Sequence, residues 1–376
     1  MLTRRLAIGW LGATTAALRL SPGLAAEGYP NARYAKAIVI DALGGPGEIF
    51  TGAPHGAPLT TRALDDARAS GVTAVNVTVG EVGNGPNQFE KTVAEIASME
   101  RELSEHPDFF LKVLRATDLT LAKSTGRMGL IFGFQDTSML DGDLHRLEMF
   151  RDLGVRICQP TYNRRNLMGD GCLEAADGGL SQLGLELIGE INRLHMLLDL
   201  SHAGRRAIAE GIAAGKAPMA ITHTGCRALV DLPRNTDDSS LRALADKGGV
   251  AGIYFMQFLH ASGQAHAEDV VRHLEHAVDV CGEDHVGIGT DRTISPIAVN
   301  DSFRESHRKY VEERRKAGIA APGESADFLP FIPEYNEPRR LKKLADDLAQ
   351  RGWKTARIEK ILGGNFARLF AEVWTA

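Results

Sequence analysis

Three residues that could bind a metal ion or move a proton lie just after apolar segments of the sequence. His202, His223 and Asp291 each come within two residues of the end of such a segment. Two imidazoles and one carboxylate are the ligand set of a catalytic zinc site that keeps one position open for water. A single histidine would more simply be a hydrogen-bonded core residue. The three together favour a metal-type or catalytic cluster, because polar residues that follow barrel strands are usually functional.

A further candidate is Arg234, in a short loop that follows His223. An arginine there is well placed to hold the carboxylate of a substrate with two parallel hydrogen bonds. The alternative is an ion pair with Asp231, Asp237 or Asp238. The sequence leaves both interpretations open.

Other motifs give weaker evidence for a functional site. His273 and His276, with His285 further on, form an H-x-x-H pattern on or after a helix that leads into the last apolar segment. We expect them on the surface or at a helix cap, away from the site. The motifs H-E-x-x-H, G-x-S-x-G and G-x-x-x-x-G-K-[ST] do not occur, which argues against helix-based zinc proteases, serine hydrolases of that type and P-loop enzymes.

The elements that would position these residues are short apolar runs separated by helical patterns. The eight runs are residues 37–41, 72–79, 128–134, 155–159, 196–200, 219–222, 250–255 and 286–289. Continuous apolar strands are typical of a parallel sheet covered on both faces. Eight strand-then-helix units predict an α/β fold of the (β/α)8 TIM-barrel type. An open doubly wound sheet is the alternative, but no G-x-G-x-x-G follows the first strand.

Three segments fall outside this repeat. Residues 42–60 are rich in Gly and Pro and predict a long loop after the first strand, near the active site of a barrel. Residues 299–336 contain a charged helix pattern and predict an insertion after the eighth strand, with a solvated face. Residues 341–374 predict two closing helices.

Composition and the N-terminus limit the possible functions. Of the 376 residues, 44% are apolar, and 43 basic against 48 acidic residues give a net charge of -5, so we expect no nucleic-acid partner. Residues 1–26 resemble a twin-arginine export signal, with an ordinary secretory signal as the alternative. A single barrel, residues 27–376, would then be periplasmic or extracellular. We expect no membrane span and four free cysteines.

Longer motifs resemble a known family. They are residues 153–166, 174–180, 192–202, 222–223, 233–235, 284–291 and 361–368. These segments are similar to the membrane (renal) dipeptidases, peptidase family M19. The resemblance implies an amidohydrolase-like barrel, a homodimer, and hydrolysis of dipeptides by two zinc ions bridged by hydroxide.

Four family positions are intact. By resemblance, His202 and His223 match the histidines of the second zinc, and Arg234 matches the arginine that binds the substrate carboxylate. Asp291 matches the acid that handles protons at the bridging water. Half of a dipeptidase site is therefore expected.

The other half departs from the family pattern. Leu43 and Gly45 stand where a His-x-Asp pair should bind the first zinc, and Gln135 replaces the bridging glutamate. Tyr162 replaces the histidine that polarises the scissile carbonyl. Two zinc ions would have too few anionic ligands. We expect one zinc on His202, His223 and Asp291, with Gln135 or Asp136 nearby.

Tyr162 would donate to the oxyanion, and it would contact the substrate together with Gln135 and Arg234. Compensation for the lost ligands by Glu48 or His55 is a weaker alternative.

Two candidate functions follow from these residues. The first is an exported metallo-dipeptidase-like hydrolase, with Asp291 and Tyr162 as catalytic residues. The second is a family member that binds or modifies a small peptide-like ligand without hydrolysing it.

Overall fold

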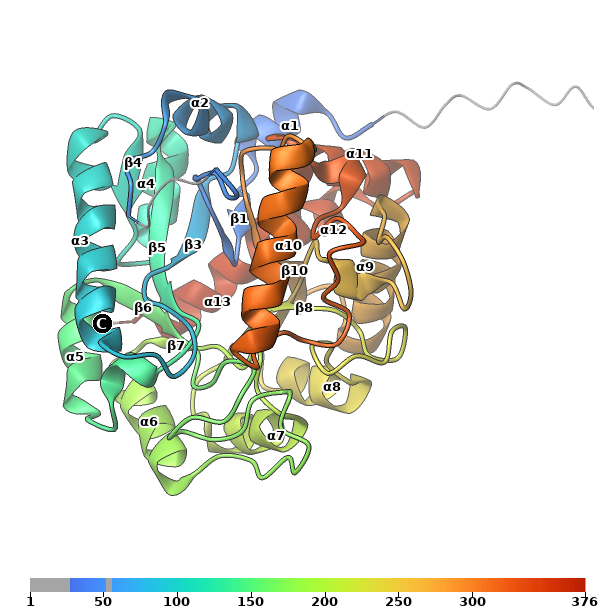
Figure 1. Ribbon diagram of the computed structural model, residues 1–376. Helices are drawn as coiled ribbons and strands as arrows, with labels where there is room; N and C mark the ends of the chain where they lie inside the picture. Colours follow the sequence, from blue (N-terminus) through green and yellow to red (C-terminus); the bar gives the residue numbers. More distant parts are fainter. Residues whose placement is uncertain (1–27, 52–55, 376) are drawn as a thin grey trace, which may run out of the picture.

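The computed structural model describes residues 28–51 and 56–375. The predicted export signal, residues 1–26, and His55 lie outside the described residues. Within the described part, eight parallel strands follow one another in chain order around a barrel (Figure 1). They are β1 (Ile40–Asp41), β3 (Ala74–Thr78), β5 (Met128–Phe134), β6 (Val155–Cys158), β7 (Leu197–Leu198), β8 (Ala220–Thr224), β9 (Val250–Ile253) and β10 (Val286–Ile288).

Two contacts close the ring. The Leu200 amide donates to the Ala220 carbonyl (2.8 Å) between β7 and β8, and the Ala42 amide donates to the Ile288 carbonyl (2.9 Å) between β1 and β10. Each barrel strand overlaps one of the eight predicted apolar runs. The (β/α)8 prediction is therefore confirmed, and the open doubly wound sheet is wrong.

Three short strands were not expected. β4 (Phe110–Lys112) pairs with β5, and β2 (Gly44–Gly45) pairs in parallel with β11 (Arg292–Thr293). A Cβ atom on Gly44 would lie 2.7 Å from the Asp41 carboxylate and 2.8 Å from the Arg292 carbonyl, so this close pairing requires glycine. The β2–β11 pair holds the segment after the first strand beside the segment that follows Asp291.

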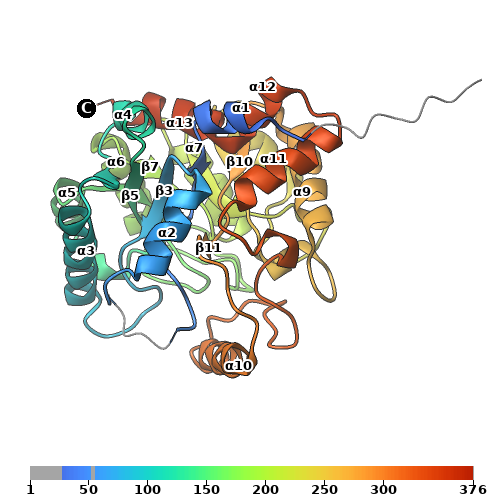
Figure 2. The same cartoon turned by 90° about the horizontal axis from the view of Figure 1, so that it is seen from above.

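Helices surround the strands and cover both ends of the barrel (Figures 1 and 2). They are α1 (Asn31–Lys36), α2 (Thr61–Ser70), α3 (Gln88–Glu105), α4 (Thr117–Thr125), α5 (His145–Asp152), α6 (Gln182–Arg193), α7 (Arg205–Ala214), α8 (Asp238–Asp246), α9 (Ala267–Cys281), α10 (Asp301–Lys316), α11 (Arg340–Gln350), α12 (Thr355–Glu359) and α13 (Asn365–Val373). The tail thus forms three helices rather than two. A five-residue π-helix, Lys360–Gly364, joins α12 to α13.

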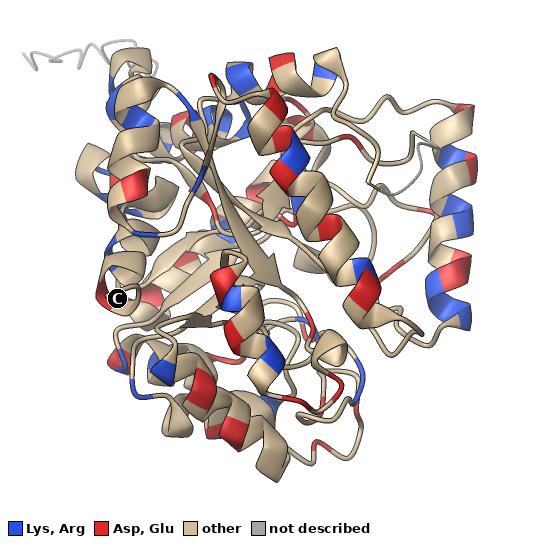
Figure 3. Cartoon of the chain, turned by 90° about the vertical axis from the view of Figure 1, so that its left-hand side faces the viewer, with Lys and Arg blue, Asp and Glu red and all other residues tan. Residues whose placement is uncertain are grey.

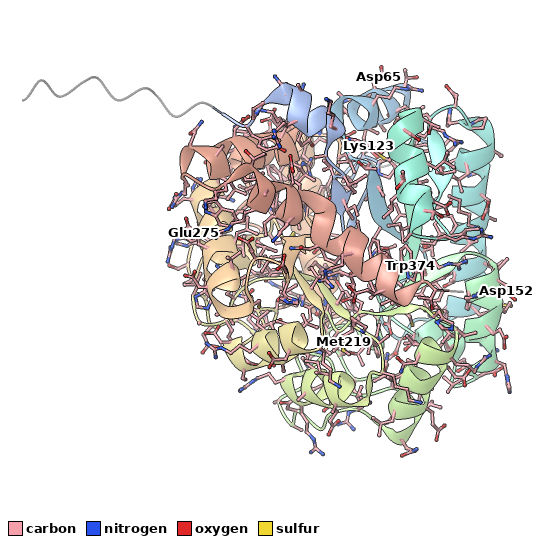
Figure 4. All side chains as sticks on the ribbon, turned by 180° about the vertical axis from the view of Figure 1, so that it is seen from behind. Asp65, Lys123, Asp152, Met219, Glu275 and Trp374 are labelled. Carbon is pink, nitrogen blue, oxygen red and sulfur yellow. The ribbon has the colours of Figure 1, made fainter. Side chains whose placement is uncertain are left out.

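The last helix, α13, covers the end of the barrel opposite α10. It crosses the back of the molecule and leads to Trp374 (Figure 4). Phe366, Leu369 and Phe370 are fully buried and pack with strand residues such as Ile131 and Leu197 in one apolar cluster. This cluster fills the end of the barrel at the amino ends of the strands, which is called the inner end below.

Helix α10 stands over the mouth of the barrel (Figure 2). The Asn300 side chain caps it by accepting a hydrogen bond from the Phe303 amide (2.9 Å). Phe303, His307 and Val311, spaced four residues apart, are buried on its inner side. The outer side carries residues of both charges (Figure 3). The predicted solvated face exists, but the opposite face contributes to the site described below.

Three further expectations meet different outcomes. All four cysteines are free thiols, and no helix in the described ranges is long and apolar enough to cross a membrane. The placement of His273 at the surface or at a helix cap is wrong. Its side chain is buried, because Nδ1 accepts from the Cys226 amide (2.8 Å) and Nε2 lies 3.1 Å from the Leu259 carbonyl.

Candidate active site

A cavity of about 640 Å³ opens at the carboxyl ends of the strands, beneath α10. Gln135, Tyr162, His202, Arg234 and Asp291 all line it, so the structure brings these predicted residues together. Their elements are far apart in sequence but adjacent around the barrel. This is the end at which barrel enzymes place their reacting groups.

A buried carboxylate fixes the two histidines. Asp199, just after β7, accepts from the amide and hydroxyl of Ser201 (3.0 and 2.7 Å) and from the amide and hydroxyl of Thr222 (3.0 and 2.6 Å). These bonds tie the turn that carries His202 to the strand that carries His223. The two imidazole centroids lie 4.9 Å apart.

The partners of the two rings set their tautomers. Thr222 gives its hydroxyl proton to Asp199, so it accepts from His223 Nδ1 at 2.9 Å. Asn163 gives its amide protons to the Ile319 carbonyl, so its oxygen accepts from His202 Nδ1 at 2.6 Å. Both Nε2 atoms are therefore left with free lone pairs. Both are buried and have no partner among the described residues.

Both imidazoles are held neutral. Burial, followed by the nearby Arg234 guanidinium, lowers the pKa of His202 and of His223 well below the usual range. A neutral imidazole anchored through Nδ1 with a free Nε2 is the form that binds transition metals. The pair is chemically suited to a metal ion.

The third expected ligand does not join this pair. In the ranges that the structure describes, no three His, Cys, Asp or Glu side chains lie where they could share a metal ion. Asp291 is instead held by its amide, which donates to the Leu43 carbonyl (2.8 Å), and the cations that act on its pKa are Arg234, Arg292 and Arg314. The protein thus supplies two prepared zinc ligands where a catalytic site uses three.

The family's two-zinc arrangement does not fit this site. The buried apolar side chain of Leu43 and the bare backbone of Gly45 offer no ligand. The Gln135 amide donates to the Thr78 hydroxyl (2.7 Å). Asp136, expected near the metal, accepts from the backbone of Gly83 and Thr137 at 2.6 and 2.7 Å, which gives it a structural role.

Glu48, the weaker alternative, lies at the cavity edge. It accepts from the Thr60 hydroxyl (2.5 Å) and pairs with Arg62 (3.4 Å). These contacts engage its carboxylate outside the histidine pair. The structure gives Glu48 no part in ligating a metal alongside His202 and His223.

Asp291 faces the cavity from a left-handed backbone conformation (φ 56°). Burial raises the pKa of this carboxyl, and the three arginines oppose the rise. A raised pKa makes the carboxylate a better base than a solvated aspartate. Asp291 is therefore equipped to accept and return a proton.

Tyr162 stacks on His202, with ring centroids 4.1 Å apart, and its hydroxyl accepts from Arg314 at 3.3 Å. Burial raises the pKa of Tyr162 to about 12, so the phenol keeps its proton at neutral pH. A protonated phenol in a buried cavity is a hydrogen-bond donor for a developing oxyanion.

Arg234 is 4% exposed, lies over the Tyr254 ring at 5.8 Å, and its Nη2 atom has no partner among the described residues. The three aspartates that could have neutralised it bind elsewhere. Asp231 pairs with Arg227, Asp237 with Arg205, and Asp238 with His276. The ion-pair alternative is therefore wrong, and the guanidinium keeps one unpaired donor, Nη2, among the described residues.

Sequence reasoning missed several cavity residues, and three of them, Arg292, Arg314 and Tyr310, carry charged or hydroxyl groups. Arg292 directly follows Asp291, so its position in the chain was an available signal. Arg314 and Tyr310 lie in the charged helix that was assigned a solvated face, and Arg314 pairs with Glu324 at 2.8 Å. Only the fold shows that one side of α10 faces inward.

A barrel that gathers two neutral imidazoles, a carboxylate and a free arginine at the carboxyl ends of its strands defines an amidohydrolase-like hydrolase. The sequence profile of the membrane dipeptidases (peptidase family M19) matches residues 62–305. The chain belongs to this family of metallo-dipeptidase-type hydrolases.

Individual proteins and solved structures are similar to most of this chain. An uncharacterized protein from the pqqA 5′ region of Klebsiella pneumoniae is 28% identical over 69% of this chain and 88% of its own length. An amidohydrolase structure from Pseudomonas aeruginosa is 30% identical, with a TM-score of 0.77 over 91% of this chain and 98% of its own. A Rhodobacter sphaeroides metallopeptidase bound to a phosphinate mimic of L-Ala-D-Ala shares the fold (19% identity, TM-score 0.71, 90% of this chain and 100% of its own).

Among the curated relatives, several proteins named as dipeptidases are longer than the matched region. The chain spans between 44% and 60% of their length. The activity of those whole proteins is therefore carried to this chain only as a proposal.

Proposed function

We propose that this chain hydrolyses the amide bond of a dipeptide or a similarly small peptide-like substrate. The observation that carries the proposal is one cavity that is lined by Arg234, with an unpaired Nη2 atom, by a partly buried carboxylate, Asp291, and by a protonated phenol, Tyr162. These groups can respectively bind the carboxylate of a dipeptide, move a proton and stabilise an oxyanion.

The protein's own residues suggest the course of the reaction. Arg234 holds the substrate carboxylate, which places the amide carbonyl near Tyr162 and Asp291. Asp291 takes a proton from the attacking water, and Tyr162 donates a hydrogen bond to the oxygen of the tetrahedral intermediate. The carbon–nitrogen bond then breaks, and Asp291 returns the proton to the leaving amine.

We also propose that one zinc ion binds His202 and His223, with Asp291 as the acidic ligand predicted from the sequence. The two free Nε2 atoms support this ion, and Asp291 lines the same cavity as His202. A bound zinc would supply Lewis acidity and would lower the pKa of a bound water to ~7.

The decisive experiment pairs metal content per protomer, by elemental analysis of the purified protein, with dipeptide cleavage measured with and without a chelator. One zinc and chelator-sensitive cleavage are expected. Cleavage that persists after complete metal removal would refute the proposed metal site. The proposed hydrolase activity would then still stand. Two metals would mean that residues outside the described ranges, such as His55, rebuild the first half-site.

A second candidate function is binding or modification of a peptide-like ligand without hydrolysis. The observation that favours it is the missing half-site, with Leu43, Gly45 and Gln135 at family ligand positions. Saturable dipeptide binding without any cleavage, at full metal loading, would select this function.

Export, assembly and location complete the proposal. Residues 1–26 would direct the protein out of the cytoplasm, and the exported chain would form a homodimer, as family resemblance implies. Cell fractionation with N-terminal sequencing tests the first point, and light scattering tests the second. Recovery of uncut protein from the cytoplasm alone, or a monomer at micromolar concentration, would contradict them.

A further inference from the structure

A second buried arginine lines the same cavity. Arg292 lies in β11, directly after Asp291, and only 9% of it is exposed. Its Nη1 atom donates to the Pro330 carbonyl at 3.3 Å, and its guanidinium lies 5.6 Å from the centre of the Phe331 ring. Its Nη2 atom is buried and has no partner among the described residues.

A buried guanidinium with an unused donor is costly, because a hydrogen bond to water has been lost and not replaced. Arg234 has the same feature in the same cavity. Besides Asp291, the cavity has two carboxylates that could neutralise these arginines, Glu324 and Glu48, and both are already paired. Arg314 and Glu324 pair with each other through two contacts of 2.8 and 2.9 Å, and Glu48 pairs with Arg62.

The charges of the cavity therefore do not balance. Once the Arg314–Glu324 and Glu48–Arg62 pairs cancel, two cations, Arg234 and Arg292, face one anion, Asp291. An ordinary dipeptide is a zwitterion, so its binding adds no net charge. Counting side chains alone, without a bound metal ion, a dipeptide with one additional carboxylate would balance these charges and give each arginine an anionic partner.

We propose that Arg292 binds a second acidic group of the substrate, so that the preferred substrates are dipeptides with an acidic side chain. This inference rests on the proposed function, in which Arg234 takes the terminal carboxylate. Arg292 would determine specificity by rejecting neutral side chains, because a neutral group leaves its guanidinium without an anionic partner.

The test is the binding of matched acidic and amide ligands by isothermal titration calorimetry: Ala-Glu against Ala-Gln, and Glu-Ala against Gln-Ala. In at least one pair, the acidic member should bind about tenfold more tightly or better, as expected for a charge-assisted hydrogen bond. Arg292→Gln should abolish this preference by weakening the acidic ligand alone. Arg292→Lys, which keeps the charge, should retain part of it.

Arg227→Gln is the matched control, because Arg227 pairs with Asp231 away from this cavity. Thermal unfolding should show that each variant is folded. If Arg292→Gln weakens acidic and amide ligands equally, Arg292 has only a structural role and the inference is overturned. If the unaltered protein binds Ala-Ala through Arg234 but shows no acidic preference, the inference fails and the proposed function stands.

Failure of the proposed function can be distinguished from failure of the two-arginine site by ligands that are not peptides. Succinate, glutarate and adipate carry two carboxylates but no peptide bond. If no dipeptide binds or is cleaved, while one of these dicarboxylates binds in a manner lost in both Arg292→Gln and Arg234→Gln, the two-arginine site is supported and the proposed function is refuted.

Discussion

Replacement of Arg234 by alanine tests the core of the proposed site. The guanidinium is almost fully buried and is not paired with any of the neighbouring aspartates. A hydrogen bond to a charged group contributes about 1.5–3 kcal/mol, which corresponds to a factor of about 10 to 150 in binding. Arg234→Ala should therefore raise KM by about 10- to 150-fold for dipeptides with a free carboxylate.

The matched substrate is the same dipeptide with an amidated C-terminus. It cannot form the ionic contact, so its KM should change by less than about threefold. Arg234→Lys should give an intermediate loss for the free acid, since lysine keeps the charge but not the planar pair of donors. Arg205→Ala is the control, because Arg205 is exposed and pairs with Asp237. Equal increases in KM for the free and amidated substrates would refute the carboxylate-binding role.

Four other perturbations have defined outcomes. His202→Ala and His223→Ala should each abolish metal retention in elemental analysis, because each removes one of two prepared Nε2 ligands. Tyr162→Phe should lower kcat by about 100-fold with little change in KM in steady-state kinetics, because it removes the oxyanion donor. Phe366→Ala should lower the free energy of unfolding by about 3–5 kcal/mol in denaturant titration, because the fully buried ring fills the inner end of the barrel. Burial raises the pKa of Asp41 to about 7, so stability should fall as the pH rises from about 4 to 7, and Asp41→Asn should flatten this slope.

The sign of the pH effect follows from proton uptake. Between about pH 4 and 7 the folded protein keeps a proton on Asp41 that the unfolded chain releases, so raising the pH favours unfolding. A stability that rises over this range because of Asp41 would contradict the assignment.

Controls separate local from general damage in the other variants. His260→Ala should retain metal, and Phe328→Ala, at a partly exposed position, should change stability by less than about 0.5 kcal/mol. Full metal content in either site histidine variant would refute the metal site. A Tyr162→Phe enzyme with unchanged kcat would remove the oxyanion role.

The barrel was predictable because its signal is local. Each barrel strand overlaps a continuous apolar run, and such runs can be recognised without knowledge of their partners. β2 and β11 have no such signal, since Gly44–Gly45 and Arg292–Thr293 become strands only by pairing with each other. Likewise, His273 is buried because two backbone groups from distant segments satisfy its ring, and nothing near it in the sequence indicates them.

The site was predictable in its parts but not in its balance of charge. The position after a strand located His202, His223 and Asp291 at one end of the barrel. It could not show that Arg292 and Arg314 converge on Asp291, because that depends on β11 and on the inward side of α10. Charge spacing along a helix indicates which residues share a face, but not what the face packs against.

The position of α13 in the chain has a consequence for how the protein is made. All eight barrel strands leave the ribosome before Phe366, Leu369 and Phe370, which fill the inner end of the barrel. Until those residues emerge, the nascent barrel exposes an apolar opening to water, and such surfaces recruit chaperones or self-associate. Closure of the barrel must therefore wait for these residues, and a ribosome stalled shortly before codon 366 would hold an aggregation-prone intermediate.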